Sequence, residues 1–310
     1  MSLAARRPMV PVIVGATAIG KTAVALELKN YWPIVAISAD SRQVYRRLDI
    51  GTAKPTNAEQ QLVRHLGIDL VEPGERYSAG RFATEAAAWL SEIPATEQPV
   101  VVGGTGFYVR ALADGLFREP PLDSTRRDRL RSWIGNRDGL GRWASRLDSE
   151  FAGGGRQRAA RAVEVALLTG RPLSWWQREA KESGVMRPWY VLLTAPRQVL
   201  YGRIEERVDR MLQMGLVAEV ENLLATGVKP NAPGLDAVGY REVVQHLIGD
   251  LANSALAASI AQSTRRYAKR QDTWFRHQLG TTDVMTLDST QPPAVLAQQI
   301  VRLWEEKGNG

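Results

Sequence analysis

Short apolar runs recur along the chain, and most of them end in glycine or small polar residues. Runs that are apolar at every position are typical of strands buried on both faces of a parallel sheet. The sequence predicts such strands at Pro11–Val14, Ile34–Ser38, Pro99–Val102 and Trp189–Thr194. Apolar residues at helical spacing over Lys21–Asn30 and Ser78–Ile93 predict helices between them. This alternation indicates an α/β fold whose parallel sheet carries helices on both faces.

Two later parts of the chain show helical spacing. The segment 118–184 contains many Arg and Trp residues and interrupts the alternation, which predicts a helical insertion domain within a core formed by 1–117 and 185–310. After Pro196 the pattern is helical nearly to the end of the chain. The predicted helices are Val199–Met214, Leu216–Leu224, Tyr240–Ile248, Ser254–Phe275 and Pro293–Glu305.

The charge of the chain is consistent with a polyanionic partner. The 310 residues include 40 Lys and Arg against 33 Asp and Glu, a net charge of +7. Residues 118–186 alone hold 14 basic and 9 acidic residues, so this segment carries most of the excess. Arg predominates over Lys, and its planar guanidinium suits bidentate contacts with phosphate. Arg residues on a solvated face would give the same composition.

Composition also excludes several classes of site. The chain contains no Cys, which excludes disulfides, thiolate nucleophiles and zinc sites that need sulfur. Its three His residues, His65, His246 and His277, are not at ligand spacing. No apolar run approaches the roughly 18 residues of a membrane span, and the run after Pro8 is too short for a signal peptide. We therefore expect a cytoplasmic protein.

A phosphate-binding motif follows the first predicted strand. The segment GATAIGKT fits the pattern GxxxxGK[ST] and precedes a predicted helix, as this motif requires. Backbone amides and the helix N-terminus attract phosphate, Lys21 adds a full charge, and Thr22 offers a hydroxyl to a phosphate-bound Mg²⁺. The predicted site for a di- or triphosphate comprises Gly15, Ala16, Thr17, Ala18, Ile19, Gly20, Lys21 and Thr22.

One acidic residue is placed to act beside these phosphates. Asp40 follows the strand Ile34–Ser38, which we expect to neighbour the strand before the phosphate loop. Open α/β sheets bind their ligands at the carboxyl ends of strands. There, Asp40 could hold a metal or take a proton from an attacking nucleophile. A local turn stabilised by the Asp40 side chain is the structural alternative.

A series of short segments resembles the tRNA dimethylallyltransferase (tRNA isopentenyltransferase) family in its short bacterial form. The segments keep the family's order from about residue 12 to 290 and so cover nearly the whole chain. Each segment alone is weak evidence, whereas their joint order and spacing are specific. The segments are GATAIGKT, ISADSRQVY (37–45), DIGTAKP (49–55), GGTGFY (103–108), RAVEV (161–165), GYR (239–241) and AKRQ (268–271).

The resemblance implies a fold and a reaction. The fold would be a P-loop NTPase-like parallel sheet flanked by helices, with a helical insertion domain. A dimethylallyl group would move from dimethylallyl diphosphate to the exocyclic amine of the adenine 3′ of the anticodon, in tRNAs that read U-initial codons, and pyrophosphate would leave. The residues that the reaction would use are Asp40 as general base, Thr17 and Lys21 at the diphosphate, and Arg203 or Arg207 beside them.

The acceptor adenine lies in a stacked RNA loop and must be extruded into the site. Proteins bind such loops with stacking aromatic side chains and with Arg or Lys at phosphates. The predicted helix Ser254–Phe275 carries a basic stripe with aromatic residues, although a solvated helix surface over core aromatics would look the same. The tRNA contacts indicated by this stripe and by the resemblance are Asp40, Ser41, Arg42, Gln43, Thr105, Gly106, Gln157, Arg158, Arg161, Arg265, Lys269, Arg270 and Trp274.

Other functions fit the same phosphate loop. A nucleoside or nucleotide kinase would use the basic insertion as a lid, and an adenylate isopentenyltransferase would share the core. An RNA-binding nucleotide switch would need a base-specificity motif such as Asn-Lys-x-Asp, which the chain lacks. The basic insertion and the helical stripe favour tRNA over a free nucleotide. We expect Mg²⁺ as cofactor, dimethylallyl diphosphate and a tRNA anticodon stem-loop as partners, no membrane, and a monomer.

Overall fold

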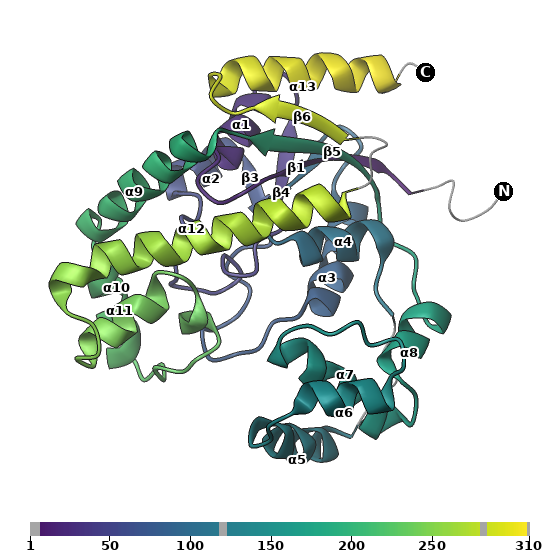
Figure 1. The fold of residues 1–310 in the computed structure, drawn as a ribbon. Coiled ribbons are helices and arrows are strands. Elements are labelled where there is room, and N and C mark those ends of the chain that lie inside the picture. Colours follow the sequence, from purple (N-terminus) through teal and green to yellow (C-terminus); the bar gives the residue numbers. More distant parts are fainter. Residues whose placement is uncertain (1–6, 118–122, 280–283, 309–310) are drawn as a thin grey trace. The chain divides into compact units, whose positions relative to one another are not determined.

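The computed structural model describes residues 7–117, 123–279 and 284–308. The chain forms two compact units (Figure 1). The core unit comprises Met1–Ala113 and Val185–Gly310, and the helical unit comprises Asp114–Gly184. The insertion domain is predicted at 118–184, and its first residues, 118–122, lie outside the described residues.

The core unit is built on a sheet of six described strands in the order β3-β2-β4-β1-β5-β6. Each pair of neighbouring strands is parallel, as expected for strands that are apolar on both faces. The strands are β1 (Met9–Val14), β2 (Ile34–Ser38), β3 (Arg64–Leu66), β4 (Gln98–Gly103), β5 (Arg187–Thr194) and β6 (Val284–Asp288). The predicted α/β fold is confirmed, and the four predicted strands lie within β1, β2, β4 and β5.

The two edge strands correct the prediction. β6 lies within the part of the chain after Pro196 that the pattern predicts as helical nearly to the end, and that prediction is wrong for these residues. β3 has three residues, none of them buried, and only Leu287 is buried in β6. Because an edge strand is covered less than a central strand, neither sequence needs the continuous apolar run that identifies the other strands.

Helices cover both faces of the sheet. The helices of the core unit are α1 (Lys21–Leu28), α2 (Asn57–Leu62), α3 (Ala79–Glu92), α4 (Gly106–Asp114), α9 (Arg197–Gln213), α10 (Leu216–Ala225), α11 (Tyr240–Leu247), α12 (Asn253–Gln278) and α13 (Pro293–Gly308). Leu28 of α1 and Ile300 of α13 pack with Ile13 and Val191 in one apolar cluster. Figure 1 shows α13 along one side of the sheet and α3 and α4 along the other.

The helical unit contains α5 (Ser124–Gly135), α6 (Leu140–Leu147), α7 (Arg156–Thr169) and α8 (Leu173–Glu179). Its own apolar cluster includes residues of all four helices. The buried Glu164 accepts hydrogen bonds from Arg127, Arg131 and Arg161 at 2.8, 3.0 and 3.2 Å. Burial raises the pKa of Glu164, but the hydrogen bonds from Arg131 and Arg127 outweigh it and lower that pKa below its usual value. One carboxylate thus faces three guanidinium groups, which leaves this cluster positive.

Candidate active site

The phosphate-binding loop connects β1 to α1, and its backbone depends on glycine. Gly15 and Gly20 have φ angles of +147° and +99°, which side-chain-bearing residues rarely adopt. A Cβ on Gly15 would lie 2.7 Å from the carbonyl oxygen of Leu193 in β5, so a side chain there would clash. Gly20 is the N-cap of α1, so the loop ends at the positive end of the helix dipole.

Lys21 folds back into this loop. Its Nζ donates hydrogen bonds to the carbonyl oxygens of Gly15 and Ala16 at 3.0 and 2.8 Å. Burial lowers the pKa of Lys21 to about 8, and Asp40 opposes this shift while Arg207 adds to it. The loop therefore holds a buried amine between a carboxylate and a second cation, and an anion bound there would favour its charged form.

We expect the Lys21 amine to take up a proton when the protein binds inorganic diphosphate at alkaline pH. The pKa of Lys21 is about 8 in the free protein, so most of the amine is neutral at pH 9, and a bound anion raises that pKa. Affinity should fall by up to about tenfold per pH unit above 8. Calorimetry in two buffers of different ionisation enthalpy measures the uptake. Lys21→Arg stays charged and should lose it; the same uptake in this variant would contradict the assignment.

Asp40 approaches the phosphate loop across an intervening strand. The strand β2 does not neighbour β1, because β4 lies between them, so the expectation of adjacent strands is wrong. The strand β4 ends at Gly103 and is followed by Gly104, and a Cβ on Gly103 would overlap the carbonyl group of Ala39. Since β4 ends without side chains, Asp40 and Lys21 line the same cavity.

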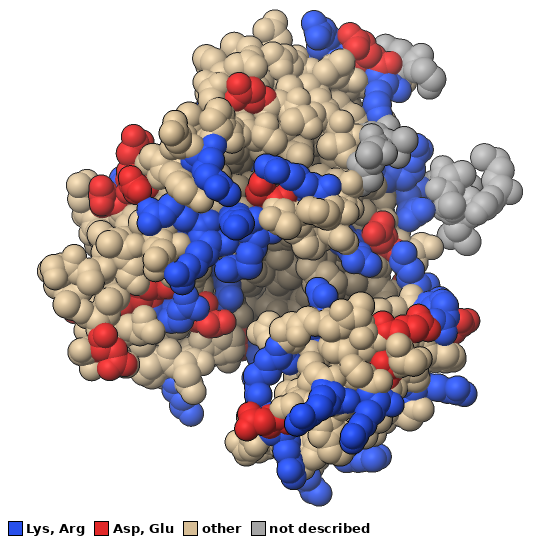
Figure 2. Space-filling view, in the orientation of Figure 1, with Lys and Arg blue, Asp and Glu red and all other residues tan. Residues whose placement is uncertain are grey.

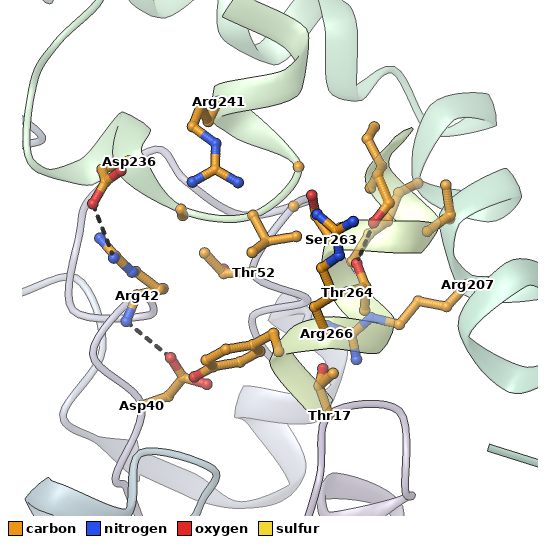
Figure 3. A pocket seen from close by; sticks show the side chains of 18 of the residues that line it. Thr17, Asp40, Arg42, Thr52, Arg207, Asp236, Arg241, Ser263, Thr264 and Arg266 are labelled. Atoms are coloured by element: carbon orange, nitrogen blue, oxygen red, sulfur yellow. Dashed lines mark hydrogen bonds and ion pairs between the residues drawn. The ribbon is translucent and has the colours of Figure 1, made fainter. Parts of the chain in front are cut away.

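The Asp40 carboxylate forms a local turn with one oxygen and leaves the other oxygen uncommitted. Its Oδ1 accepts a hydrogen bond from the backbone N–H of Arg42 at 2.8 Å, which is the local turn of the structural alternative (Figure 3). Its Oδ2 has no hydrogen-bond partner among the residues that the structure describes. The turn therefore fixes the carboxylate and leaves one oxygen available for chemistry.

Two cavities meet at this carboxylate. The small cavity has a volume of about 360 Å³ and lies between Asp40, the loop after β2 and helices α9 and α12. The large cavity, of about 890 Å³, contains the phosphate loop and the residues Asp49–Asn57. The residues that line both cavities are Thr17, Asp40, Thr52, Arg207, Met211 and Tyr267. A ligand in each cavity would thus meet the other at Thr17 and Asp40.

The small cavity is strongly basic. Figure 3 shows Arg207, Arg241 and Arg266 among the side chains that line it and Arg42 between Asp236 and Asp40. Arg42 donates to the Pro233 carbonyl oxygen at 2.9 Å and pairs with Asp236 at 3.7 Å. The basic and acidic residues that line the cavity are Arg42, Arg207, Arg241, Arg266, Arg270, Asp40 and Asp236. This excess of cations suits a ligand that carries several phosphates.

The contacts of Arg203 and Arg207 distinguish two arginines that sequence reasoning left equivalent. The Arg203 guanidinium donates to the hydroxyl and carbonyl oxygens of Ser289 at 3.2 and 2.8 Å and to the Ile19 carbonyl oxygen at 3.4 Å. Arg207 has no hydrogen-bond or ion-pair partner within the described ranges and lines both cavities. Burial lowers the pKa of Arg207, which Asp40 opposes. Both arginines line the large cavity, and of the two it is Arg207 whose guanidinium remains available to a ligand there.

Several predicted RNA contacts shape the wall around Asp40. Thr105 accepts a hydrogen bond from the Ser41 backbone N–H at 3.0 Å. The Gln43 amide donates to the carbonyl oxygens of Thr52 and Ala53 at 3.3 and 3.1 Å. These hydrogen bonds fix the segment that follows Asp40, and Ser41, Gln43 and Thr105 line neither of the two cavities.

The basic stripe on α12 divides into residues that face the small cavity and residues that do not. Arg270 lines the cavity, with its guanidinium 5.6 Å from the centre of the Tyr267 ring. Arg265 instead pairs with Glu205 at 2.9 Å. The Trp274 ring packs where a Cβ on Gly106 would lie. Lys269 is exposed and lines neither cavity.

The remaining predicted RNA contacts lie in the helical unit. Gln157 and Arg158 are exposed in the first turn of α7. Arg161, one turn later, belongs to the cluster around Glu164. Their spacing places them on neighbouring positions of one helix, as the sequence indicates.

The sequence assigned no role to two residues of the site, Arg241 and Gln271. Arg241 lines the small cavity, as does Arg266 of the basic stripe, and Gln271 joins the phosphate loop to α12. Arg241 and Gln271 lie in segments that carry the family resemblance, GYR and AKRQ. Residues 263, 267, 270 and 271 also share one face of a helix, and this spacing is the signal that would have found Gln271.

The described residues contain no group of three or more His, Asp or Glu side chains that could hold a metal ion. None of the described helices is both long and apolar enough to cross a membrane.

Comparison with known proteins identifies relatives across most of the chain. The profile of the IPP transferase family matches residues 43–278. The tRNA dimethylallyltransferase of Syntrophobacter fumaroxidans is 41% identical over 86% of this chain and 80% of its own length. The tRNA dimethylallyltransferase 1 of Syntrophotalea carbinolica is 41% identical, with 92% of each chain covered.

Solved structures agree with this relationship. The full-length tRNA isopentenylpyrophosphate transferase of Bacillus halodurans is 32% identical with a TM-score of 0.70, covering 98% of this chain and 99% of its own. A eukaryotic dimethylallyltransferase acting on tRNA shares the fold with a TM-score of 0.74 at 24% identity, covering 91% of this chain and 74% of its own. The chain belongs to the tRNA dimethylallyltransferase, or IPP transferase, family.

Proposed function

We propose that the protein transfers a dimethylallyl group from dimethylallyl diphosphate to the exocyclic amine of the adenine 3′ of the anticodon, in tRNAs that read U-initial codons. The observation that carries the proposal is the wall of Thr17 and Asp40, which faces the phosphate-loop cavity on one side and the arginine-lined cavity on the other. Two substrates that enter from opposite sides would meet at this wall.

The large cavity would hold the donor. When the allylic carbon–oxygen bond breaks, its electron pair stays on the diphosphate, which leaves as pyrophosphate. Lys21, the amides at the start of α1 and the partner-free Arg207 surround the position of this growing negative charge. Preorganised donors and cations of this kind stabilise a leaving group more than they stabilise the bound substrate.

Mg²⁺ would be held chiefly by the diphosphate. Magnesium prefers phosphate oxygens, water and one or two protein oxygens to a cage of protein ligands. Thr22 lines the large cavity next to Lys21 and offers one hydroxyl oxygen there. This sparse donor set fits a metal that arrives with its phosphates and neutralises their charge.

The small cavity would hold the extruded adenine. The exocyclic amine of adenine is a poor nucleophile because the nitrogen lone pair is delocalised into the ring. A carbon–nitrogen bond forms to the allylic carbon, Asp40 Oδ2 takes one proton of the amine, and the electron pair of the broken carbon–oxygen bond leaves with the diphosphate. The surrounding arginines would bind the phosphates on either side of the extruded nucleotide.

Affinity for an anticodon stem-loop should fall steeply with salt. Lys and Arg side chains gather over α12 and its neighbour α9 (Figure 2). Neutralising several phosphates releases counterions, so we expect at least about a tenfold loss of affinity between 50 and 200 mM salt. Fluorescence anisotropy with a labelled stem-loop measures this dependence, and Arg266→Gln should reduce the slope by about 1. A flat salt response would argue against a polyanionic partner.

The decisive experiment is incubation with labelled dimethylallyl diphosphate and an anticodon stem-loop, followed by mass analysis of the nucleosides. We expect label on the adenine 3′ of the anticodon and pyrophosphate release only when RNA is present. Label on AMP in place of RNA would indicate an adenylate isopentenyltransferase. Phosphoryl transfer from ATP to a nucleoside, without prenylation, would indicate a kinase. Because the acceptor is tRNA, we expect the enzyme to act in the cytoplasm and, as the family resemblance implies, as a monomer.

A further inference from the structure

A buried glutamine connects the phosphate loop to the helix that lines the other cavity. Gln271 lies on α12 and is 6% exposed, although its side chain is polar. Its Oε1 accepts a hydrogen bond from the backbone N–H of Thr17 at 2.8 Å. Its Nε2 donates to the carbonyl oxygen of Gly104 at 2.8 Å. Both ends of the amide are thus used by backbone groups that lie far away in the sequence.

The groups around this side chain match an amide in this orientation. A Cβ on Gly104 would overlap the Gln271 amide, so the glycine that follows β4 is what lets Gln271 approach. An uncharged amide offers an acceptor to Thr17 and a donor to Gly104 at once, which an ionised carboxylate does not. A carboxylate would face the Gly104 carbonyl oxygen with no proton and would place a negative charge beside a bound diphosphate.

We infer that Gln271 is a positioning residue for the proposed transfer, acting through Thr17 and not on the reacting atoms. Thr17 lies on the wall shared by both cavities, so its position sets how the donor faces the acceptor amine. The same helix carries Arg266 and Arg270 into the small cavity. Gln271 thereby fixes the phosphate loop relative to the helix that receives the acceptor. This inference rests on the proposed function.

The first test replaces the amide by an uncharged, apolar side chain of similar length. Gln271→Met loses both hydrogen bonds, and the misplaced Thr17 should lower kcat about tenfold or more. The KM for the stem-loop should stay within about threefold, because the arginines that bind RNA are unchanged. Gln262→Met, at an exposed position of α12 that lines neither cavity, is the matched control and should behave as the wild type.

The second test uses pH, which a purely structural role in folding would not reproduce. In Gln271→Glu the buried carboxyl can donate to Gly104 and accept from Thr17 only when it is protonated. The ratio of its kcat to that of the wild type should therefore rise at least about tenfold from pH 8.5 to pH 6. Both measurements are made well below the melting temperature, which thermal unfolding establishes for each variant.

The outcomes separate this inference from the proposed function. If the wild type prenylates RNA and Gln271→Met keeps full kcat, or if the Gln271→Glu ratio does not change with pH, Gln271 is not a positioning residue. If Gln271→Met does not fold, the pH dependence of Gln271→Glu decides the question. If the wild type prenylates neither RNA nor AMP, the proposed function fails, whatever the variants do.

Discussion

Replacing Asp40 by Asn is expected to lower kcat by roughly a hundredfold or more, while the protein keeps its fold and its affinity for an anticodon stem-loop. The Asn side-chain oxygen can still accept the hydrogen bond from the Arg42 backbone N–H, which Asp40 Oδ1 accepts at 2.8 Å. The amide has no basic oxygen to take a proton from the adenine amine. General-base catalysis by one side chain contributes about 10² to 10⁴ in rate.

A second substitution at this position separates the turn from the chemistry. Asp40→Ala should lose the same catalytic factor and, in addition, about 1 kcal/mol of stability, because the Arg42 N–H loses its partner. Single-turnover assays give the rate, urea unfolding gives the stability, and anisotropy gives the affinity for the stem-loop. Near-normal turnover in both variants would remove Asp40 from the mechanism.

Removing the carboxylate should not weaken donor binding, which provides a further check. Asp40 is the negative charge that opposes the lowered pKa of Lys21 and of Arg207. At a pH well below the Lys21 pKa, where the amine keeps its proton, the phosphate loop without Asp40 is more positive. Inorganic diphosphate should there bind Asp40→Asn at least as tightly as the wild type. A large loss of diphosphate affinity would mean that Asp40 holds the metal, which is the other role its position allows.

The central strands could be predicted from sequence because their environment is uniform. Residues of β1 and β2 are covered on both faces, so nearly every position is apolar, and the run itself marks the strand. The edge strand β6 has a neighbouring strand on one side only, and two of its five residues, Thr286 and Asp288, are polar. Its pairing with β5 depends on the fold of the whole sheet, and five local residues do not encode it.

The candidate site also contains a part that local sequence predicts and a part that depends on the whole fold. The phosphate loop is one local segment whose glycines, lysine and helix start are adjacent in sequence, so its pattern predicts the site. The role of Gln271 depends on Thr17, which is 254 residues away, and the approach of Asp40 depends on a β4 strand that ends in glycine. Local spacing cannot show such contacts, because topology alone brings these segments together.

The arginines of α9 show this limit most directly, because Arg203 and Arg207 lie one helical turn apart with the same side chain. We expect Arg207→Met to lower kcat/KM for dimethylallyl diphosphate by roughly a hundredfold or more. The Arg207 guanidinium lines both cavities and has no partner among the described residues, so it is free to meet the leaving diphosphate. Removing one preorganised donor from such a site costs about 10² to 10³ in rate.

Arg203→Met is the matched control, with the opposite expected result. It loses the hydrogen bonds to Ser289 and Ile19, which hold the end of β6 and the phosphate loop against α9. Its stability to urea should fall by about 1 to 3 kcal/mol, while kcat/KM measured well below its unfolding transition should stay within about tenfold of the wild type. Arg207→Met should retain wild-type stability, because the Arg207 side chain has no hydrogen bond or ion pair with a described residue that the substitution would remove. If kcat/KM falls more in Arg203→Met than in Arg207→Met, then Arg203 binds the diphosphate. The diphosphate must in that case lie closer to Ile19 than to Asp40.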